Sequence, residues 1–501
     1  MQFVSFGFLV FAAVLLVLYY TVPRQFQWIL LLTASYVFYL WAGPQYLFFI
    51  LFTTFSTYAA TRLMDRNLSA LAALPREEKK VQKAVVKKKN RIIMIVCLVA
   101  NFGILSVCKF RFSFQNIALP MGISFYMFQS MGYLIDVNRG TVKAEKSLPK
   151  LALFVSYFPQ LLQGPISKFA QLSPQLCARH DYDGKQVSLG LQRILWGFFK
   201  KLVIADRIAV AMIALKAPEY TGVSFLVLTV FYAVQIYGDF TGGIDMAMGL
   251  SQALGINLAE NFIRPFFSKN IAEYWRRWHI TLGTWMKDYI FYPISVSGPM
   301  RKLSKAARAK YGNFGKRLPV YVASVATWFV TGIWHGFTPN FVVWGMLNCF
   351  VIVVSEELMP VYEKFHNRFH LKEKKWYGGF EMLRMFMLMN LIRIVDLFPH
   401  VGEYFRRMGS LFTTFNFHIL WDGTLMNLGL TGLDYGILGV GIAIMFGVSL
   451  TEEKKGSVRE LLWNGNVWVR YVLTFGLLLA VILLGRYGIG YDAGNFIYNQ
   501  F

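Results

Sequence analysis

Residues 270–293 read NIAEYWRRWHITLGTWMKDYIFYP, a crowded amphipathic stretch in an otherwise apolar chain. Placed on a helix at about 100° per residue, its apolar side chains share one sector: Ile271, Trp275, Trp278, Leu282, Trp285, Met286 and Tyr289. The opposite side carries Glu273, Arg276, Arg277, Thr284, Lys287 and Asp288. Between the two sides lies His279. So many ionisable groups exclude a bilayer-crossing helix. The pattern predicts one continuous helix that lies in the membrane interface or lines a wet cavity.

The rest of the chain has the composition of a membrane protein. Of its 501 residues 56% are hydrophobic and only 16% are charged, whereas about 25% of the residues in a soluble protein are charged. Several uncharged runs are long enough to span roughly 30 Å of hydrocarbon. We expect an all-α polytopic membrane protein with about eleven or twelve crossings, besides interfacial or re-entrant helices.

Positive charge is concentrated in short segments between apolar runs. The net charge is +24, and two lysine-rich segments, 76–91 and 301–317, contribute much of it. Because short basic loops stay on the cytoplasmic side, this charge indicates membrane topology and not a nucleic-acid partner. Counting back over the three apolar runs before residue 76 places the N-terminus outside.

No long linker or low-complexity tract interrupts the chain, so we expect a single membrane domain over 1–501. Within it we distinguish N-terminal helices (1–61), a basic cytoplasmic loop (62–91), a catalytic core (92–355) and C-terminal helices (356–501). Residues 151–163 are apolar but short and run into FPQLLQGPISKF at 158–169, where Pro159, Gly164 and Pro165 break helices. We therefore predict a half-span or re-entrant piece here.

Acids and cations also occur within membrane-like sequence. Asp239 and Asp245 lie among glycines in GDFTGGIDMAMG at 238–249. Intramembrane acids are functional candidates, but the two could equally be helix N-caps at a kink. Arg193, Lys200 and Lys201 interrupt another apolar run, where we expect them to extend toward the interface.

A lone histidine is the sharper candidate for chemistry. Residues 318–355 contain no Asp, Glu, Lys or Arg, and His335 lies within them in TGIWHGFTPNFVVWG at 331–345. Gly336 and Pro339 predict a helix break beside it. Apolar surroundings favour neutral imidazole, which can take a proton from a hydroxyl. The alternative is a structural histidine bonded to a carbonyl that the break frees, and His279 has the same two interpretations. No Cys pair or metal-ligand spacing predicts a metal, although a site from both histidines and Asp239, Asp245 or Asp288 stays open.

The segment EYWRRWHITLGTWMKDYIFYPI at 273–294, followed by GIWHG at 332–336, resembles the membrane-bound O-acyltransferase (MBOAT) superfamily. Within it, the chain is most similar to the bacterial alginate O-acetyltransferase branch, which is related to the teichoic-acid D-alanyl transfer protein. Five further segments resemble this branch in the same order: LPMGISFYMFQSMGYLIDVNRG (119–140), FVSYFPQLLQGPISKF (154–169), GLQRILWGFFKKLVIADR (190–207), YAVQIYGDFTGGIDMAMGLSQALGINLAENFIRPF (232–266) and FIYNQF (496–501).

The resemblance implies a ring of tilted helices around a central tunnel, in a bacterial cytoplasmic (inner) membrane. It implies that His335 is the catalytic histidine and that His279 is a second signature histidine with a positioning role. His335 would take the proton of an acceptor hydroxyl, and His279, with Arg276 or Arg277, would orient the donor or stabilise the oxyanion. Asp288 would pair with one of these arginines. We expect substrate-binding residues to include Arg276, Arg277, Trp278, Asp288, Trp334 and Asp239.

The donor implied is a cytoplasmic thioester, acetyl-CoA or an acyl-carrier-protein thioester, with no bound cofactor and no metal. The implied partners are membrane lipids, an extracytoplasmic SGNH-type or other relay acyltransferase, and a polysaccharide acceptor. GDFTGGIDMAMG at 238–249 and SVSGPM at 295–300 depart from the branch pattern and leave the acceptor open.

Three other functions stay open. D-alanyl transfer to teichoic acid is the alternative within the family. A proton-coupled transporter would use Asp239, Asp245 and His335 as a proton path. A noncatalytic scaffold for polysaccharide export would tolerate substitution of His335.

Overall fold

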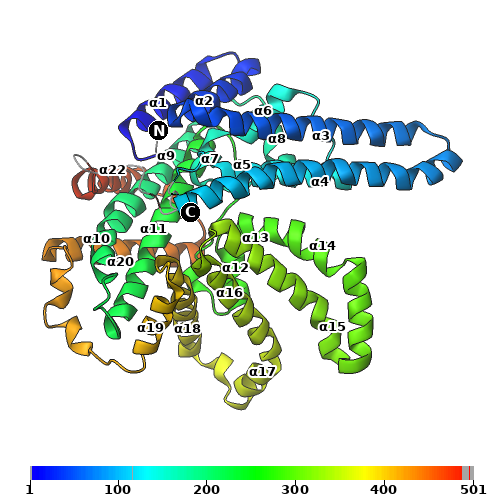
Figure 1. The fold of residues 1–501 in the computed structure, drawn as a ribbon. Helices are drawn as coiled ribbons and strands as arrows, with labels where there is room; N and C mark the ends of the chain where they lie inside the picture. The colour runs from blue at the N-terminus through cyan, green and yellow to red at the C-terminus, as the bar shows by residue number, and fades with distance from the viewer. Residues whose placement is uncertain (1–2, 116, 488–495, 497–501) are drawn as a thin grey trace. The chain divides into compact units, whose positions relative to one another are not determined.

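The computed structural model of the protein describes residues 3–115, 117–487 and 496, and all regular elements in this part of the chain are helices (Figure 1). Of the final FIYNQF, only Phe496 lies within the described residues. The chain forms two compact units. Unit 1 comprises residues 1–194 and 243–259, and unit 2 comprises 195–242 and 260–501. The single-domain organisation stays a prediction.

Unit 1 contains the N-terminal helices. They are α1 (Phe6–Thr21), α2 (Gln27–Ala42), α3 (Leu47–Ala73), α4 (Arg76–Gln115), α5 (Ile123–Arg139), α6 (Leu148–Ser156), α7 (Phe158–Gln163), α8 (Phe169–Leu176) and most of α9 (Gly184–Phe198). Helix α11 (Val223–Ala253) contributes its last residues to this unit, where the Tyr157 hydroxyl lies 3.1 Å from Ser251 Oγ. The chain breaks at Tyr157, between α6 and α7, and α7 ends before Gly164. The half-span or re-entrant character of this piece stays a prediction.

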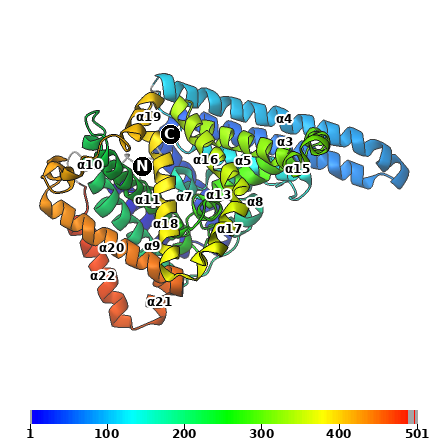
Figure 2. The same ribbon diagram turned by 90° about the horizontal axis from the view of Figure 1, so that it is seen from below.

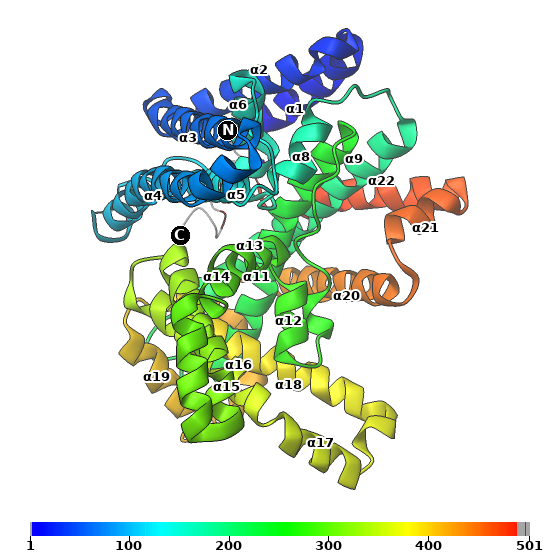
Figure 3. The same cartoon turned by 90° about the vertical axis from the view of Figure 1, so that its right-hand side faces the viewer.

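Unit 2 contains the candidate site. Its longer helices are α10 (Asp206–Leu215), the first part of α11, α15 (Gly298–His335), α16 (Pro339–Glu357), α17 (Met359–Arg368), α18 (Lys375–Arg393), α19 (Val401–Ser410), α20 (Gly432–Lys455) and α22 (Val467–Leu484). Its shorter pieces include η3 (Phe199–Ala205), α12 (Ile271–Arg277), α13 (Ile280–Met286), η5 (Lys287–Phe291), α14 (Tyr292–Ser295) and α21 (Val458–Asn464). Helices α12, α16 and α18 pack against one another (Figure 3).

Six helices of the described chain are long and apolar enough to cross a membrane. They lie at Pro44–Ala73, Arg76–Gln115, Val223–Ala253, Pro339–Glu357, Gly432–Lys455 and Val467–Leu484. This identifies a multi-pass membrane protein. The six fall short of the eleven or twelve predicted crossings, because several apolar runs form short or broken helices; α1, for example, has 16 residues.

Both basic segments are helical and are not the loops that we predicted. Residues 62–73 end α3 and residues 76–91 begin α4, so the two helices form an antiparallel hairpin with its turn near Pro75 (Figures 1 and 2). Residues 301–317 lie in α15, which is interrupted at Gly312 by a positive φ of 56°. The lysine-rich sequence did not indicate this conformation, although lysine and arginine are good helix formers. The cytoplasmic location of both segments stays a prediction.

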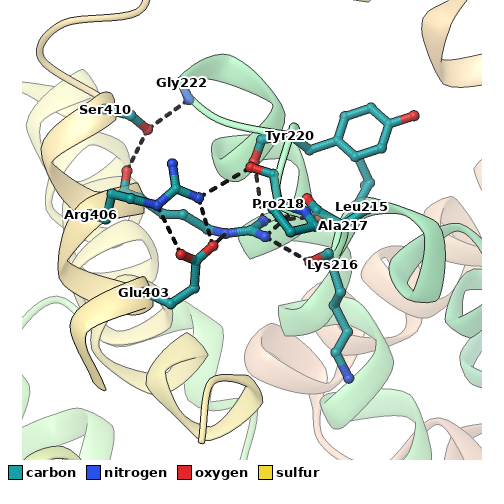
Figure 4. A network of polar contacts seen from close by, with 10 residues as sticks. Leu215, Lys216, Ala217, Pro218, Tyr220, Gly222, Glu403, Arg406 and Ser410 are labelled. Atoms are coloured by element: carbon teal, nitrogen blue, oxygen red, sulfur yellow. Dashed lines mark hydrogen bonds and ion pairs between the residues drawn. The ribbon is translucent and has the colours of Figure 1, made fainter. Parts of the chain in front are cut away.

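A buried arginine ties α19 to the end of α10 within unit 2. The Arg407 guanidinium donates to the carbonyls of Lys216, Ala217 and Tyr220 at 2.7–3.1 Å, and to Glu403 Oε1 at 2.6 Å. Figure 4 also shows the Ser410 hydroxyl of α19, which accepts from the Gly222 amide at 2.8 Å and donates to the Arg407 carbonyl at 2.7 Å. A cation that satisfies the carbonyls exposed at a helix C-terminus stabilises that terminus, so Arg407 has a structural role here.

Candidate active site

The stretch at 270–293 does not form the continuous helix that we predicted. Helix α12 ends at Arg277, and His279 has left-handed backbone angles (φ 45°, ψ 51°) before α13 begins at Ile280. The preceding segment stabilises this break, because the Ile263 amide donates to the Arg277 carbonyl and the Ile280 amide donates to the Asn261 carbonyl. A left-handed non-glycine residue costs roughly 1–2 kcal/mol, which these contacts offset.

The apolar sector predicted for this stretch is nevertheless largely buried. Its buried members are Ile271, Trp278, Leu282, Trp285, Met286 and Tyr289. On the polar side Arg276 and Lys287 are exposed. The amphipathic pattern was therefore correct in which side chains it buries, although the helix is divided.

His279 is held rigidly in the core of unit 2. Its side chain is 3% exposed, and its Nδ1 lies 3.2 Å from Asn261 Oδ1. The aromatic rings of Phe240 and Trp334 have their centroids 5.0 and 6.1 Å from the imidazole. Burial, together with the positive charge of Arg393, lowers the pKa of His279 to about 3. The imidazole is therefore neutral at physiological pH.

His335 is the last residue of α15, and the chain leaves the helix beside it as predicted. Residues 336–338 are non-helical, and α16 begins at Pro339. A Cβ atom at Gly336 would lie 2.3 Å from the Phe341 ring, so only glycine allows this tight return. The His335 imidazole is 8% exposed, with the rings of Trp334 and Trp344 centred 4.9 and 4.8 Å away.

The structure brings the two histidines to one cluster through Trp334. The Trp334 indole, itself buried, contacts the imidazoles of both His279 and His335. Phe341 stacks on His335 at a centroid distance of 6.3 Å. Two buried imidazoles from separate elements thus share one aromatic enclosure, which we call the histidine cluster: Phe240, Trp278, His279, Trp334, His335, Phe341, Trp344 and Arg393.

Arg393 and Asn261 belong to the site although no sequence pattern marked them as site residues. Arg393 ends α18, is buried, and holds its guanidinium carbon 4.2 Å from the ring centroid of Trp278 and 5.8 Å from that of Trp344. A single arginine at the end of an apolar run is a weak signal, since such cations commonly extend to the interface. Asn261 lies in an irregular segment with no periodicity to mark it.

Other predicted site residues have structural partners. Arg277 bonds Glu453 through both terminal nitrogens at 2.9 Å and also pairs with Glu273, so Asp288 is not the acid that holds it. Arg276 is exposed, and Asp288 is half-buried on η5. Of the substrate-binding residues predicted in this stretch, Trp278 alone belongs to the histidine cluster.

The two membrane acids also differ from our expectation. Asp239 and Asp245 lie inside α11 and not at a helix N-terminus, so the N-cap interpretation is wrong. Asp239 pairs with Lys201 at 2.6 Å in unit 2, and Asp245 pairs with Arg193 at 2.8 Å in unit 1. Lys201 also pairs with Asp206 at 2.7 Å. Lys200 and Lys201 are buried and do not extend to the interface.

The histidine cluster can support acid–base chemistry in a low-dielectric site. Neutral imidazoles accept protons from hydroxyl groups, and a buried guanidinium stabilises negative charge that develops on an oxygen. No group of three or more His, Cys, Asp or Glu side chains in the described chain could hold a metal ion.

The sequence pattern of the membrane-bound O-acyltransferase family matches residues 141–395, just over half of the chain and a range that includes both histidines. A protein of Azotobacter vinelandii named "Probable alginate O-acetylase" is 35% identical over 352 residues, covering 67% of this chain and 64% of that protein. A Helicobacter pylori peptidoglycan O-acetyltransferase is 29% identical, covering 55% of this chain and 58% of the relative. A Bacillus subtilis teichoic acid D-alanyltransferase is 26% identical, covering 52% of this chain and 64% of that relative.

These alignments span less than two thirds of each relative's length. The residues that the family pattern matches include every member of the histidine cluster. The chain belongs to the membrane-bound O-acyltransferase family.

Proposed function

We propose that this member of the membrane-bound O-acyltransferase family transfers a short acyl group, in the first instance acetyl, from a thioester to a hydroxyl. The observation that carries the proposal is the histidine cluster: two buried imidazoles against one indole, inside the segment that the family pattern matches. The donor enters from the cytoplasm, and the acceptor is a hydroxyl of an extracytoplasmic polysaccharide or of a relay protein.

In the proposed mechanism His335 acts as the general base. It takes the proton of the acceptor hydroxyl while the oxygen attacks the thioester carbonyl carbon. The tetrahedral intermediate collapses, the carbon–sulfur bond breaks, and the leaving thiolate takes the proton back from the imidazolium. The acyl–oxygen bond is the one formed. His279 orients a substrate beside the reacting carbonyl.

Arg393 is the better candidate for stabilising the oxyanion than Arg276 or Arg277. Its guanidinium is buried against Trp344, whose ring also contacts His335. Arg276 is exposed, and Arg277 is held by Glu453 and Glu273. In a site that excludes water, a fixed cation near the carbonyl oxygen is worth several kcal/mol in the transition state.

The membrane arrangement follows from the same proposal. We also propose a ring of helices around a central tunnel in a bacterial cytoplasmic membrane, with the N-terminus outside and the basic segments 76–91 and 301–317 in the cytoplasm. The donor is acetyl-CoA or an acyl-carrier-protein thioester. The partner is an extracytoplasmic SGNH-type or other relay acyltransferase that passes the group to the polysaccharide.

D-alanyl transfer is the second candidate, supported by the similarity to the Bacillus subtilis enzyme at 26% identity. The higher identity of 35% to an alginate O-acetylase favours acetyl. The transporter hypothesis is weaker, because Asp239 and Asp245 already form close ion pairs with Lys201 and Arg193.

The experiment uses the full chain in nanodiscs with acetyl-CoA labelled in its acetyl group. We expect transfer to hydroxyl acceptors or release of labelled acetate, and a loss of about 10²–10⁴-fold in His335→Ala. His400→Ala, at an exposed histidine before α19, is the matched control and should retain the rate. D-alanyl thioesters serve as a competing donor. The enzyme proposal fails if the wild type turns over no thioester, and a scaffold is then favoured.

A further inference from the structure

Asn261 is completely buried, and three groups lie within hydrogen-bond distance of its side-chain oxygen. Its Oδ1 accepts from the Thr281 backbone amide at 3.0 Å and from Thr281 Oγ1 at 2.8 Å. The third contact is His279 Nδ1 at 3.2 Å. The Asn261 backbone carbonyl also accepts from the Ile280 amide at 3.0 Å, so Asn261 is bonded to both residues that follow His279.

The Thr281 contact fixes which way the amide points. Amide oxygen and nitrogen are otherwise hard to distinguish, and their assignment depends on the hydrogen-bond partners. A backbone N–H can only donate, so the Asn261 atom that faces it must be the oxygen. The same oxygen faces His279, and an amide oxygen can only accept. Nδ1 of His279 therefore carries the proton, which in neutral imidazole leaves Nε2 unprotonated.

We propose that Asn261 is a positioning residue that holds His279 in its Nδ1–H tautomer, so that Nε2 accepts a hydrogen bond from a substrate N–H or O–H. In this tautomer Nε2 has no proton to donate to an oxyanion. We therefore assign stabilisation of the oxyanion to Arg393 and orientation of the substrate to His279. This inference rests on the proposed function for its substrate, but the tautomer itself does not depend on turnover.

The first test reads the tautomer directly. The full chain, labelled with ¹⁵N at histidine and reconstituted in nanodiscs, is examined by solid-state NMR, with the His279 signals assigned from their loss in His279→Asn. We expect Nδ1 in the protonated range and Nε2 in the unprotonated range at neutral pH. A protonated Nε2 overturns the proposal, whether or not the protein has acyltransferase activity.

The second test separates positioning from folding. Asn261→Leu removes the acceptor, and we expect kcat to fall about 10–100-fold, as for other outer-shell partners of functional histidines, with a tautomer mixture at His279. Asn390→Leu is the matched control, because Asn390 is equally buried but its amide bonds Phe386 in its own helix. If the two variants lose the same activity and His279 keeps its tautomer in both, the role of Asn261 is structural and the proposal fails.

Asn261→Asp gives the signature that a structural role would not produce. It keeps the acceptor oxygen but places a carboxylate beside the imidazole, which favours the imidazolium. The charge of Arg393 opposes this change. We expect substantial activity at alkaline pH and an acid limb of the pH–rate profile that moves to higher pH. An unchanged profile contradicts the proposal. If the wild type is inactive, the proposed function fails, and the NMR result still decides the tautomer.

Discussion

Two pairs of ionisable groups in the described chain differ in their surroundings: two acids of α11 and two histidines of unit 2. Asp239 and Asp245 each meet a cation within hydrogen-bond distance, at 2.6 and 2.8 Å. His279 and His335 are instead surrounded mainly by aromatic rings. A carboxylate neutralised by a close cation stabilises the packing of its helix, whereas a neutral imidazole retains its proton-accepting chemistry. The ion-paired acids of α11 are therefore weaker functional candidates than the two buried histidines.

The largest effect on activity is expected at His335. His335→Ala should lower turnover about 10²–10⁴-fold while leaving the thermal unfolding temperature in nanodiscs close to that of the wild type. Rate and unfolding are measured on the same preparation. If stability falls strongly while the remaining folded protein keeps full activity, His335 has a structural role like that of the ion pairs and not a catalytic one.

The opposite result is expected at Lys201. Lys201→Met leaves the buried Asp239 without its cation, and removing one partner of a buried pair costs about 3–5 kcal/mol. We expect a lower unfolding temperature but a normal rate per folded molecule. Lys201→Met combined with Asp239→Leu should recover part of the stability, because Asp206, the second acid that pairs with Lys201, still lacks its cation. A specific loss of rate in the stable double variant would show that the pair has a catalytic role.

Arg393 tests the cation that belongs to the histidine cluster. Arg393→Met should reduce kcat by about 100-fold or more if the guanidinium stabilises the oxyanion. Arg393→Lys keeps the charge but loses the planar contact with Trp278, so we expect an intermediate rate. Steady-state kinetics separate the effects: equal rates for both variants would exclude a role for the charge.

The pH dependence of stability should reveal His279. Its pKa is about 3 in the folded chain, against an ordinary value of 6.5. Between these values the unfolded chain binds the proton and the folded chain does not, so stability is present above pH 6.5 and is lost progressively as pH falls. Thermal unfolding followed across this range should show the loss in the wild type. His279→Asn, which tolerates the left-handed backbone, should show a smaller loss, and an identical curve would contradict this assignment.

The smallest effect is expected at Arg276, which the sequence pattern grouped with the substrate-binding residues. Its side chain is exposed on α12, and exposed surface substitutions usually change stability by less than about 0.5 kcal/mol. Arg276→Ala should leave both the rate and the unfolding temperature nearly unchanged. A marked increase in KM would restore Arg276 to the substrate site.

Local patterns predicted several features correctly. The apolar sector at 270–293 is largely buried, and the helix break beside His335 follows from Gly336 and Pro339. The division of 270–293 at His279 was not predictable, because it depends on backbone hydrogen bonds from Asn261 and Ile263. Those bonds replace the hydrogen bonds of a continuous helix, and the spacing of apolar residues cannot predict them.

The sequence by itself determined the class of protein, the burial of most apolar side chains at 270–293 and the two histidines as candidates, because composition, spacing and side-chain chemistry are local properties. The tertiary structure alone decided which charged residues are neutralised. The pairing of Lys201 with Asp239, the placement of Arg393 over Trp278 and the bond from Asn261 to His279 each join residues far apart in the chain. Electrostatic energies depend on distance in space and on burial, and both are set only when the chain has folded.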